Sequence, residues 1–139
     1  MNFEPTLRKM IDGVPGALGI ALMGSDGIPI AEVQPQLGRQ AGAGGLELES
    51  EDGAEGADGA EVGAAGVEFG RVLDEIRKAA DGLGAGRLEE ALVGLARYWL
   101  LFRVVDDELF LIAALEPRGN LGKARFLMRR HLLELREQL

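Results

Sequence analysis

Cysteine is absent from the 139-residue sequence, and histidine, tryptophan and tyrosine each occur once. The lack of cysteine excludes disulfide bonds, thiolate metal ligands and cysteine nucleophiles, and is typical of proteins in a reducing compartment. A single histidine, His131, is too little for a histidine-rich metal site, and it lies on the charged side of a predicted helix, which disfavours a Ser/His/Asp triad. We therefore expect no catalytic residue, cofactor or metal site, and a protein that is not an enzyme.

Long hydrophobic runs are also missing. The most apolar region is interrupted by Arg97, Arg103 and Asp106, well short of the roughly 18 residues that a membrane span needs. The amino-terminal stretch MNFEPTLRKM has no apolar run of the kind found in secretory signals. We expect a cytoplasmic protein without membrane insertion.

The charge is unevenly distributed. The net charge is −8, and the segment from Gly38 to Gly66 holds seven acidic residues and one arginine, a net of −6 that leaves −2 for the rest. The same segment has nine glycines and no apolar period. We predict a single domain over residues 1–139 with a disordered, acidic insert at about 38–66. The acids either serve solvation or attract a basic partner, and the overall charge argues against nucleic acid.

Apolar patterning predicts the elements of the folded part. A short helix near the amino terminus precedes the apolar strand ALGIALMG, and an Asp26-Gly27 turn leads into a second strand that Pro29 assigns to a sheet edge. An amphipathic helix begins at Val67, three strands follow, and a long helix ends the chain. The segment LFLIAAL is apolar at both parities, which predicts a central strand. The fold class is α+β, a sandwich with a five-stranded, mainly antiparallel sheet between helices, in the order α-β-β-α-β-β-β-α.

The segment GNLGKAR superficially resembles a phosphate-binding loop. A loop of the GxxxxGK[ST] type needs glycine and a hydroxyl where this chain has Pro117 and Ala124. We interpret the segment as a turn with Asn120 capping the final helix. A small nucleotide-binding domain that uses Lys123 and Arg125 remains an alternative, and calorimetry with ATP or GTP separates the two.

The strand RLEEALVGL is typical of a sheet edge that is either guarded by charge or paired with another chain. If two copies join at this edge, the middle helices can meet across the dyad and bury apolar side chains. The predicted dimer interface consists of Phe69, Val72, Leu73, Ile76, Ala80, Leu88, Glu90 and Leu92.

The order of elements, the hairpin MGSDGIPI and the segment GNLGKARFLMRR resemble the roadblock (dynein light-chain) family. The likeness covers Phe3 to Val33 and Val67 to Leu139, and is greatest to bacterial members of the gliding-motility MglB and MglC kind, MglC above all. The insert between Gly38 and Gly66 departs from the compact pattern of that family.

The resemblance implies a non-catalytic homodimer with a continuous ten-stranded sheet, acting on or near a small Ras-like GTPase in cell polarity or motility. Under it, the chain is an adaptor that binds another roadblock protein or polarity factor, with Asp26 and Ile28, and also Lys123 and Arg125, as partner-binding candidates. The alternative is an MglB-like GTPase-activating protein that acts directly on the GTPase.

Overall fold

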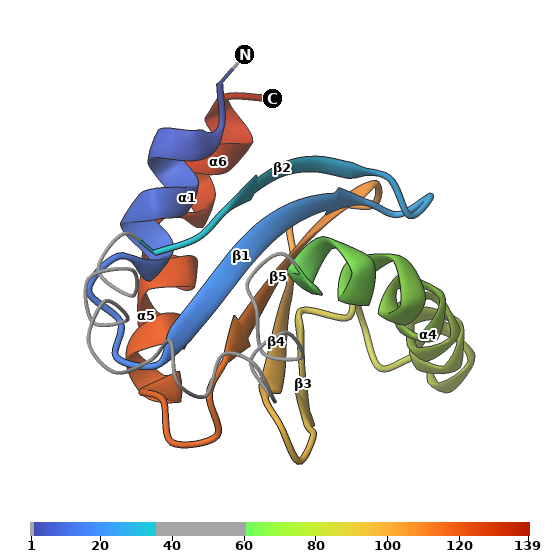
Figure 1. Cartoon of the computed structure of the whole chain (residues 1–139). Coiled ribbons are helices and arrows are strands. Elements are labelled where there is room, and N and C mark those ends of the chain that lie inside the picture. Colours follow the sequence, from blue (N-terminus) through green and yellow to red (C-terminus); the bar gives the residue numbers. More distant parts are fainter. Residues whose placement is uncertain (1, 36–60) are drawn as a thin grey trace.

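A computed structural model describes residues 2–35 and 61–139. In the described part, helices cover both faces of a five-stranded antiparallel sheet with the strand order β2-β1-β5-β4-β3 (Figure 1). The predicted fold class and order of elements are confirmed. The elements are α1 (Glu4–Ile11), β1 (Ala17–Gly24), β2 (Pro29–Val33), α4 (Glu61–Leu83), β3 (Glu90–Gly94), β4 (Trp99–Val104), β5 (Leu109–Leu115), α5 (Leu121–Arg130) and α6 (Leu132–Glu137).

Strand β5 is the middle strand of the sheet, as its sequence LFLIAAL predicts. Every residue from Phe110 to Leu115 is buried. Phe110, Ile112 and Ala114 belong to the core under α4, whereas the alternating residues belong to the core on the opposite face. Because successive side chains of a strand point to opposite faces, a strand covered on both sides must be apolar at both parities.

One face of the sheet is covered by α1, α5 and α6. Leu7 and Met10 of α1 and Met128 and Leu135 of the terminal helices are all buried there, against Leu111 of β5. The terminal segment was predicted as one long helix, but it is divided at His131.

Helix α6 is held against α1 by polar contacts that begin at this division. Glu134 accepts a hydrogen bond from Lys9 Nζ at 2.6 Å, and its other carboxylate oxygen lies 3.2 Å from His131 Nδ1. Gln138 donates to the buried hydroxyl of Thr6 at 2.8 Å. These contacts direct the last turns of the chain toward α1.

The other face is covered by α4, which begins at Glu61 and not at Val67 as predicted. Gly66 and Gly70 lie on the buried side of this helix; a Cβ at Gly66 would be 2.8 Å from Met23 Sδ, and one at Gly70 would be 3.4 Å from Phe110. Gly66, which was predicted to belong to the disordered insert, and Gly70 of the predicted helix therefore allow α4 to approach the sheet closely. The remainder of the predicted insert, residues 38–60, lies outside the described residues.

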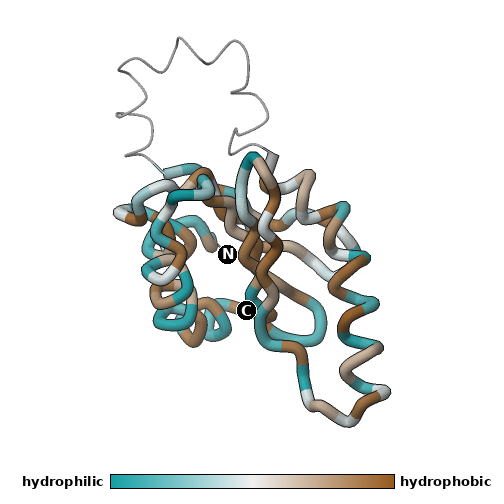
Figure 2. The backbone as a smooth tube through the Cα atoms, turned by 90° about the horizontal axis from the view of Figure 1, so that it is seen from below, coloured by the Kyte–Doolittle hydropathy of each residue, from teal (hydrophilic) through white to brown (hydrophobic). Residues whose placement is uncertain are grey.

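The carboxyl-terminal half of α4 extends beyond the sheet. Figure 2 shows hydrophobic strands in the middle of the molecule and the far end of α4 projecting past them. Arg77 fixes this half, since its guanidinium donates to the carbonyl oxygens of Asp107 at 3.0 Å and Asp106 at 3.5 Å, in the turn between β4 and β5. The helix ends at Leu83, followed by Gly84 with a φ of 66°, a position where glycine is favoured.

The turns that the sequence predicts are present. Asp26 Oδ1 accepts a hydrogen bond from the Ile28 amide at 3.1 Å, and Gly27 has a φ of 91°. Asn120 Oδ1 accepts from the Lys123 amide at 3.0 Å, which confirms it as the cap of α5. The segment GNLGKAR is thus a turn and a helix start.

Two glycine backbones cross where β1 begins and α5 is about to begin. A Cβ at Gly16 would lie 2.4 Å from Gly119 Cα, and Gly16 has a φ of 84°. Hydrogen bonds from Asn120 N to Pro15 O and from Glu116 N to Gly16 O, both 2.8 Å, close this crossing. It joins the start of the first strand to the end of the last one.

We expect Gly16→Ala to destabilise the protein by about 2–4 kcal/mol, because the new methyl group overlaps backbone atoms and the φ value is unfavourable. The matched control is Gly27→Ala, which has a similar φ of 91° but nothing within 4 Å of the added Cβ, and should cost only about 1 kcal/mol. Urea unfolding of both variants measures the difference. Equal losses would show that the crossing is not tightly packed.

A second prediction concerns pH. Hydrogen bonds from Lys9 and His131 lower the pKa of the Glu134 carboxyl from its ordinary 4.5. A carboxyl with a lowered pKa in the folded state adds stability above its unfolded pKa, and this contribution is lost as the pH falls through the folded pKa. Glu134→Gln should therefore be less stable than wild type at about pH 7 and nearly equal to it at about pH 3.

The measurement is the free energy of unfolding as a function of pH. Glu137→Gln, a change at an exposed residue of the same helix, is the control and should follow wild type throughout. A Glu134→Gln deficit that is constant from neutral to acid pH would contradict an ionic origin.

Candidate functional site

The outer edge of β3 presents unused backbone hydrogen-bonding groups. Leu95 N donates to Tyr98 O, and Glu89 O accepts from Val104 N, both at 3.0 Å. In an antiparallel pair, residues alternate between those that bond to the neighbouring strand and those that face away from it. Glu90, Leu92 and Gly94 therefore direct their amide and carbonyl groups away from β4, toward the open edge of the sheet.

The face of the sheet beside α4 is incompletely covered near this edge. Ala91 and Val93 of β3 are only half-buried, and they pack with Phe69 of α4 against the core. On α4 itself, Val72 is 47% exposed and Ile76 is 39% exposed. The exposed apolar side chains of α4 and the half-buried ones of β3 are thus available for contact with a second molecule that joins the sheet at this edge.

The residues predicted for a dimer interface do not all lie on this surface. Val72, Ile76 and Leu92 are exposed, while Glu90, Ala80, Leu88 and Phe69 are half-buried. Leu73 is 3% exposed and packs against its own sheet. Helical periodicity identifies the apolar residues of α4, but it does not separate those that face the sheet from those that face solvent.

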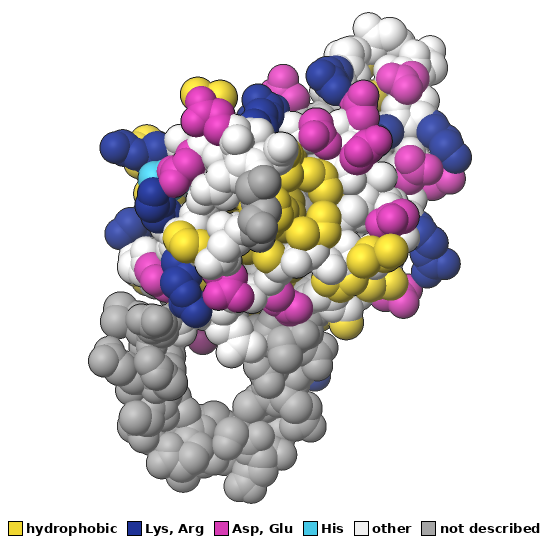
Figure 3. Space-filling view, turned by 90° about the horizontal axis from the view of Figure 1, so that it is seen from above, with side chains coloured by type: hydrophobic (Ala, Val, Ile, Leu, Met, Phe, Trp, Pro, Cys, Tyr) yellow, Lys and Arg dark blue, Asp and Glu magenta, His cyan; other side chains and the backbone are white. Residues whose placement is uncertain are grey.

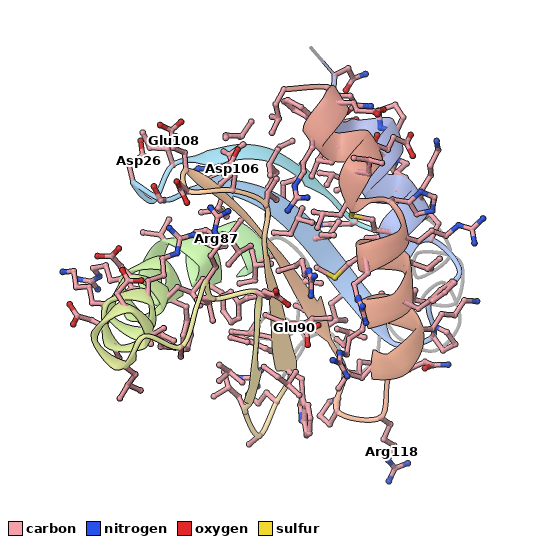
Figure 4. All side chains as sticks on the ribbon, turned by 180° about the vertical axis from the view of Figure 1, so that it is seen from behind. Asp26, Arg87, Glu90, Asp106, Glu108 and Arg118 are labelled. Carbon is pink, nitrogen blue, oxygen red and sulfur yellow. The ribbon has the colours of Figure 1, made fainter. Side chains whose placement is uncertain are left out.

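Glu90, labelled in Figure 4, lies beside two arginines, Arg125 and Arg103. Arg125 of α5 donates to both carboxylate oxygens, from Nε at 3.0 Å and from a terminal nitrogen at 2.6 Å. The hydrogen bond to Glu90, and then its charge, raise the pKa of the Arg125 guanidinium. Arg103 lies 3.9 Å from the same carboxylate. The arrangement ties the terminal helix to the edge strand.

The two basic candidates for partner binding are engaged within the chain. Arg125 forms the bidentate pair with Glu90. Lys123 Nζ donates to the carbonyl oxygen of Gly13 at 2.9 Å, which joins α5 to the turn after α1. Both side chains therefore have a structural role that spacing along the sequence does not reveal.

The hairpin candidates Asp26 and Ile28 lie at the end of the sheet where two turns meet. Ser25 N donates to Glu108 O at 2.8 Å, which places the turn between β1 and β2 beside the turn between β4 and β5. Figure 4 shows Asp26, Asp106 and Glu108 together at this end. Ile28 is 60% exposed. Apolar and acidic side chains are therefore presented side by side.

Figure 3, which looks onto the side where β2 lies in Figure 1, shows hydrophobic side chains gathered in a patch bordered by acidic ones. Ile30 of β2, 46% exposed, belongs to the same edge strand as Pro29. Proline cannot donate to a neighbouring strand, so this second sheet edge is less suited to strand pairing than β3.

The terminal helices also expose apolar side chains that sequence reasoning missed. Phe126 is 57% exposed and Leu133 is 63% exposed. The guanidinium of Arg130 lies 6.0 Å from the centre of the Phe126 ring. The seven-residue separation of Phe126 and Leu133 could have predicted them, because it places both side chains on one face of a continuous helix. The apolar residues that face the sheet gave a stronger pattern.

Metal ligands do not gather in the described part of the chain. In residues 2–35 and 61–139, no group of three or more His, Asp or Glu side chains could hold a metal ion. No helix within the same ranges is long and apolar enough to cross a membrane.

Comparison with solved structures identifies proteins of similar fold. No protein-family model and no curated protein sequence matches the chain. The crystal structure of MglC from Myxococcus xanthus matches at a TM-score of 0.64 and 29% identity, covering 100% of both chains. A roadblock/LC7 domain from Streptomyces avermitilis matches at a TM-score of 0.73 and 12% identity, over 99% of this chain and 98% of that one.

The gliding protein MglB from Thermus thermophilus also matches, at a TM-score of 0.62 and 17% identity over 99% of this chain and 87% of that one. Matches at such low identity show the fold, while the likeness to MglC extends to the sequence over its full length. The chain thus has the roadblock fold, and it is similar in sequence to MglC over the full length of both chains.

Proposed function

We propose that this chain is a non-enzymatic, homodimeric adaptor in a polarity or motility system governed by a small Ras-like GTPase. The observation that carries the proposal is the β3 edge, which leaves three residues with outward-facing backbone groups next to a half-covered apolar face. Joining two such edges satisfies these groups and buries the apolar side chains at the same time. The 29% identity to MglC over the full length supports an adaptor.

The geometry of the β3 edge supports a twofold dimer. Two copies of β3 related by a twofold axis pair as antiparallel strands, and their sheets become one ten-stranded sheet. The exposed residues Val72 and Ile76 of α4 then lie near the same axis. A twofold interface uses the same patch on both subunits, so each favourable contact occurs twice.

The partner surface is the hairpin end with Asp26 and Ile28. It lies at the far side of the sheet order from β3, so a dimer formed at β3 leaves it free. An exposed isoleucine beside carboxylates suits a small protein interface with an apolar centre and a charged rim. We assign this end to another roadblock protein or polarity factor.

Leu92→Pro tests the dimer with little effect on the subunit. Proline removes an amide that faces away from β4, and proline is tolerated at outward-facing edge positions. We expect the variant to remain folded and to sediment as a monomer where wild type is a dimer, with the affinity of the dimer lowered at least about tenfold, or about 1.4 kcal/mol.

The control is Leu92→Ala, which keeps the amide and shortens the side chain. It should remain dimeric, with a smaller loss of affinity. Sedimentation equilibrium over about 1–100 µM, a range that includes weak interfaces, measures both. A Leu92→Pro protein that is as dimeric as wild type would show that the chains do not join at β3.

The alternative is a GTPase-activating protein of the MglB kind, which the resemblance also implies. The two roles differ in one measurement, the rate of GTP hydrolysis by a candidate Ras-like GTPase with and without this protein. For an adaptor we expect no acceleration, together with binding to a roadblock partner that Ile28→Lys abolishes, because a charge replaces the exposed apolar centre.

The control for binding is Arg118→Glu, at an exposed position away from the hairpin (Figure 4), which should bind as wild type does. Acceleration of hydrolysis by tenfold or more, about 1.4 kcal/mol in barrier height, would instead establish the activating role.

A further inference from the structure

The outer side of the terminal helices forms a basic and apolar surface, which we call the basic stripe: Phe126, Arg129, Arg130 and Leu133. The two apolar residues are among the most exposed large hydrophobics of the described chain. Helix α5 contains no acidic residue. Within residues 2–35 and 61–139, neither Arg129 nor Arg130 has an ion pair, and the Arg130 guanidinium lies over the Phe126 ring.

The hairpin end has the opposite character. Ile28 and Ile30 are exposed there, and Asp26 and Glu108 have no ion pair to any described residue. Asp26 uses one oxygen for the Ile28 amide, which leaves the other available. By contrast, Asp107 in the same region is already paired with Arg87. Two free carboxylates and two isoleucines are thus presented together.

The two surfaces complement each other in kind and number. Each has two exposed apolar side chains and two charged side chains that form no ion pair with a described residue, although α6 also carries the exposed Glu137. They lie at opposite sides of the molecule, α5 on one side of the sheet and the hairpin at the far end (Figures 1 and 4). One chain therefore cannot bring its own hairpin onto its own basic stripe, whereas two chains can.

We propose that the hairpin end of one copy, with Asp26, Ile28 and Glu108, docks on the basic stripe of a second copy. The inference rests on the proposed function, in which the hairpin binds another roadblock protein, and it names a terminal helix as the surface that the hairpin recognises. The contact joins unlike surfaces, so it is heterologous and extends assemblies beyond a closed dimer.

The basic stripe and the proposed dimer interface are separate surfaces. It lies on the outer side of α5 and α6, whereas the dimer uses the β3 edge and α4. Arg125 ties α5 to β3 through Glu90 but is not part of the stripe. The two kinds of contact can thus be broken independently. Because the charges are exposed, the docking should weaken as added salt screens them.

The test is a pair of charge-reversed variants studied by sedimentation velocity at about 10–500 µM, where weak contacts are populated. One variant carries Arg129→Glu and Arg130→Glu, and the other carries Asp26→Lys and Glu108→Lys. We expect wild type to associate beyond the dimer at low salt, and each variant alone to do so at least about tenfold more weakly, since like charges then oppose each other.

A mixture of the two variants should regain association, because each then meets a surface of opposite charge. Restoration on mixing cannot arise from a folding defect. Glu108→Lys alone replaces the second variant if loss of the Asp26 hydrogen bond disturbs the turn, and Arg118→Glu is the control that should behave as wild type.

A wild-type protein that stays dimeric throughout, or variants that fail to associate on mixing, would overturn the docking. The failure of the proposed dimer is a different result: wild type would then be a monomer at the lowest concentrations, and Leu92→Pro would change nothing, whatever the charge-reversed variants do.

Discussion

The two-sided burial of β5 is the constraint on which the rest of this structure depends. A strand that is apolar at every position can exist only in a sheet covered on both faces, so helices must pack on each side. On one face, the helices α1, α5 and α6 cover the apolar side chains of the sheet. On the other, a single helix, α4, packs mainly against β1, β2 and β5. The incomplete cover beside β3 follows from having one helix for a five-stranded face.

The short distance between α4 and the sheet depends on the glycines of this helix. Gly66 and Gly70 bring α4 near Met23 and Phe110. A carboxylate oxygen of Glu32, from the edge strand β2, accepts the Gly63 amide at 3.0 Å and so meets one unsatisfied donor at the helix start. Close packing at the beginning of α4 and projection at its end together position its exposed apolar residues beyond the sheet.

Local signals in the sequence predicted most of the fold. The run LFLIAAL, the position of Pro29, the turn at Asp26 and the cap at Asn120 each depend on residues within a few positions, and all were found. The start of α4 was placed too late because Gly63 and Gly66 resemble a loop by composition, while their partners, Glu32 and Met23, lie far earlier in the chain. The division at His131 was missed for a similar reason. The helix that follows it is held by a contact between Glu134 and Lys9, which are far apart in sequence.

The candidate site was less predictable than the fold, for the same reason. The edge position of β3 followed from its pattern, but which backbone groups face outward requires the register with β4. Lys123 and Arg125 were predicted to bind a partner because the sequence does not show which residues of the chain lie next to a cation on a helix. The structure shows each engaged with a group that is remote in sequence, Gly13 and Glu90. A single sequence does not reveal which residues far apart in the chain contact each other.

The distribution of charge explains why this chain can offer several separate surfaces. Cations that bind inside the chain, such as Arg125 and Arg77, hold helices to the sheet or its turns and are unavailable to partners. Arg129 and Arg130, on the outer side of the terminal helices, form no ion pair with a described residue, and neither do Asp26 and Glu108 at the hairpin end, although Asp26 accepts the Ile28 amide. A charge without a partner inside the fold has lost no hydration and retains its full interaction with an opposite charge on another molecule. The proposed association surfaces therefore lie where internal pairing stops, at β3 for backbone groups and at the hairpin and basic stripe for side chains.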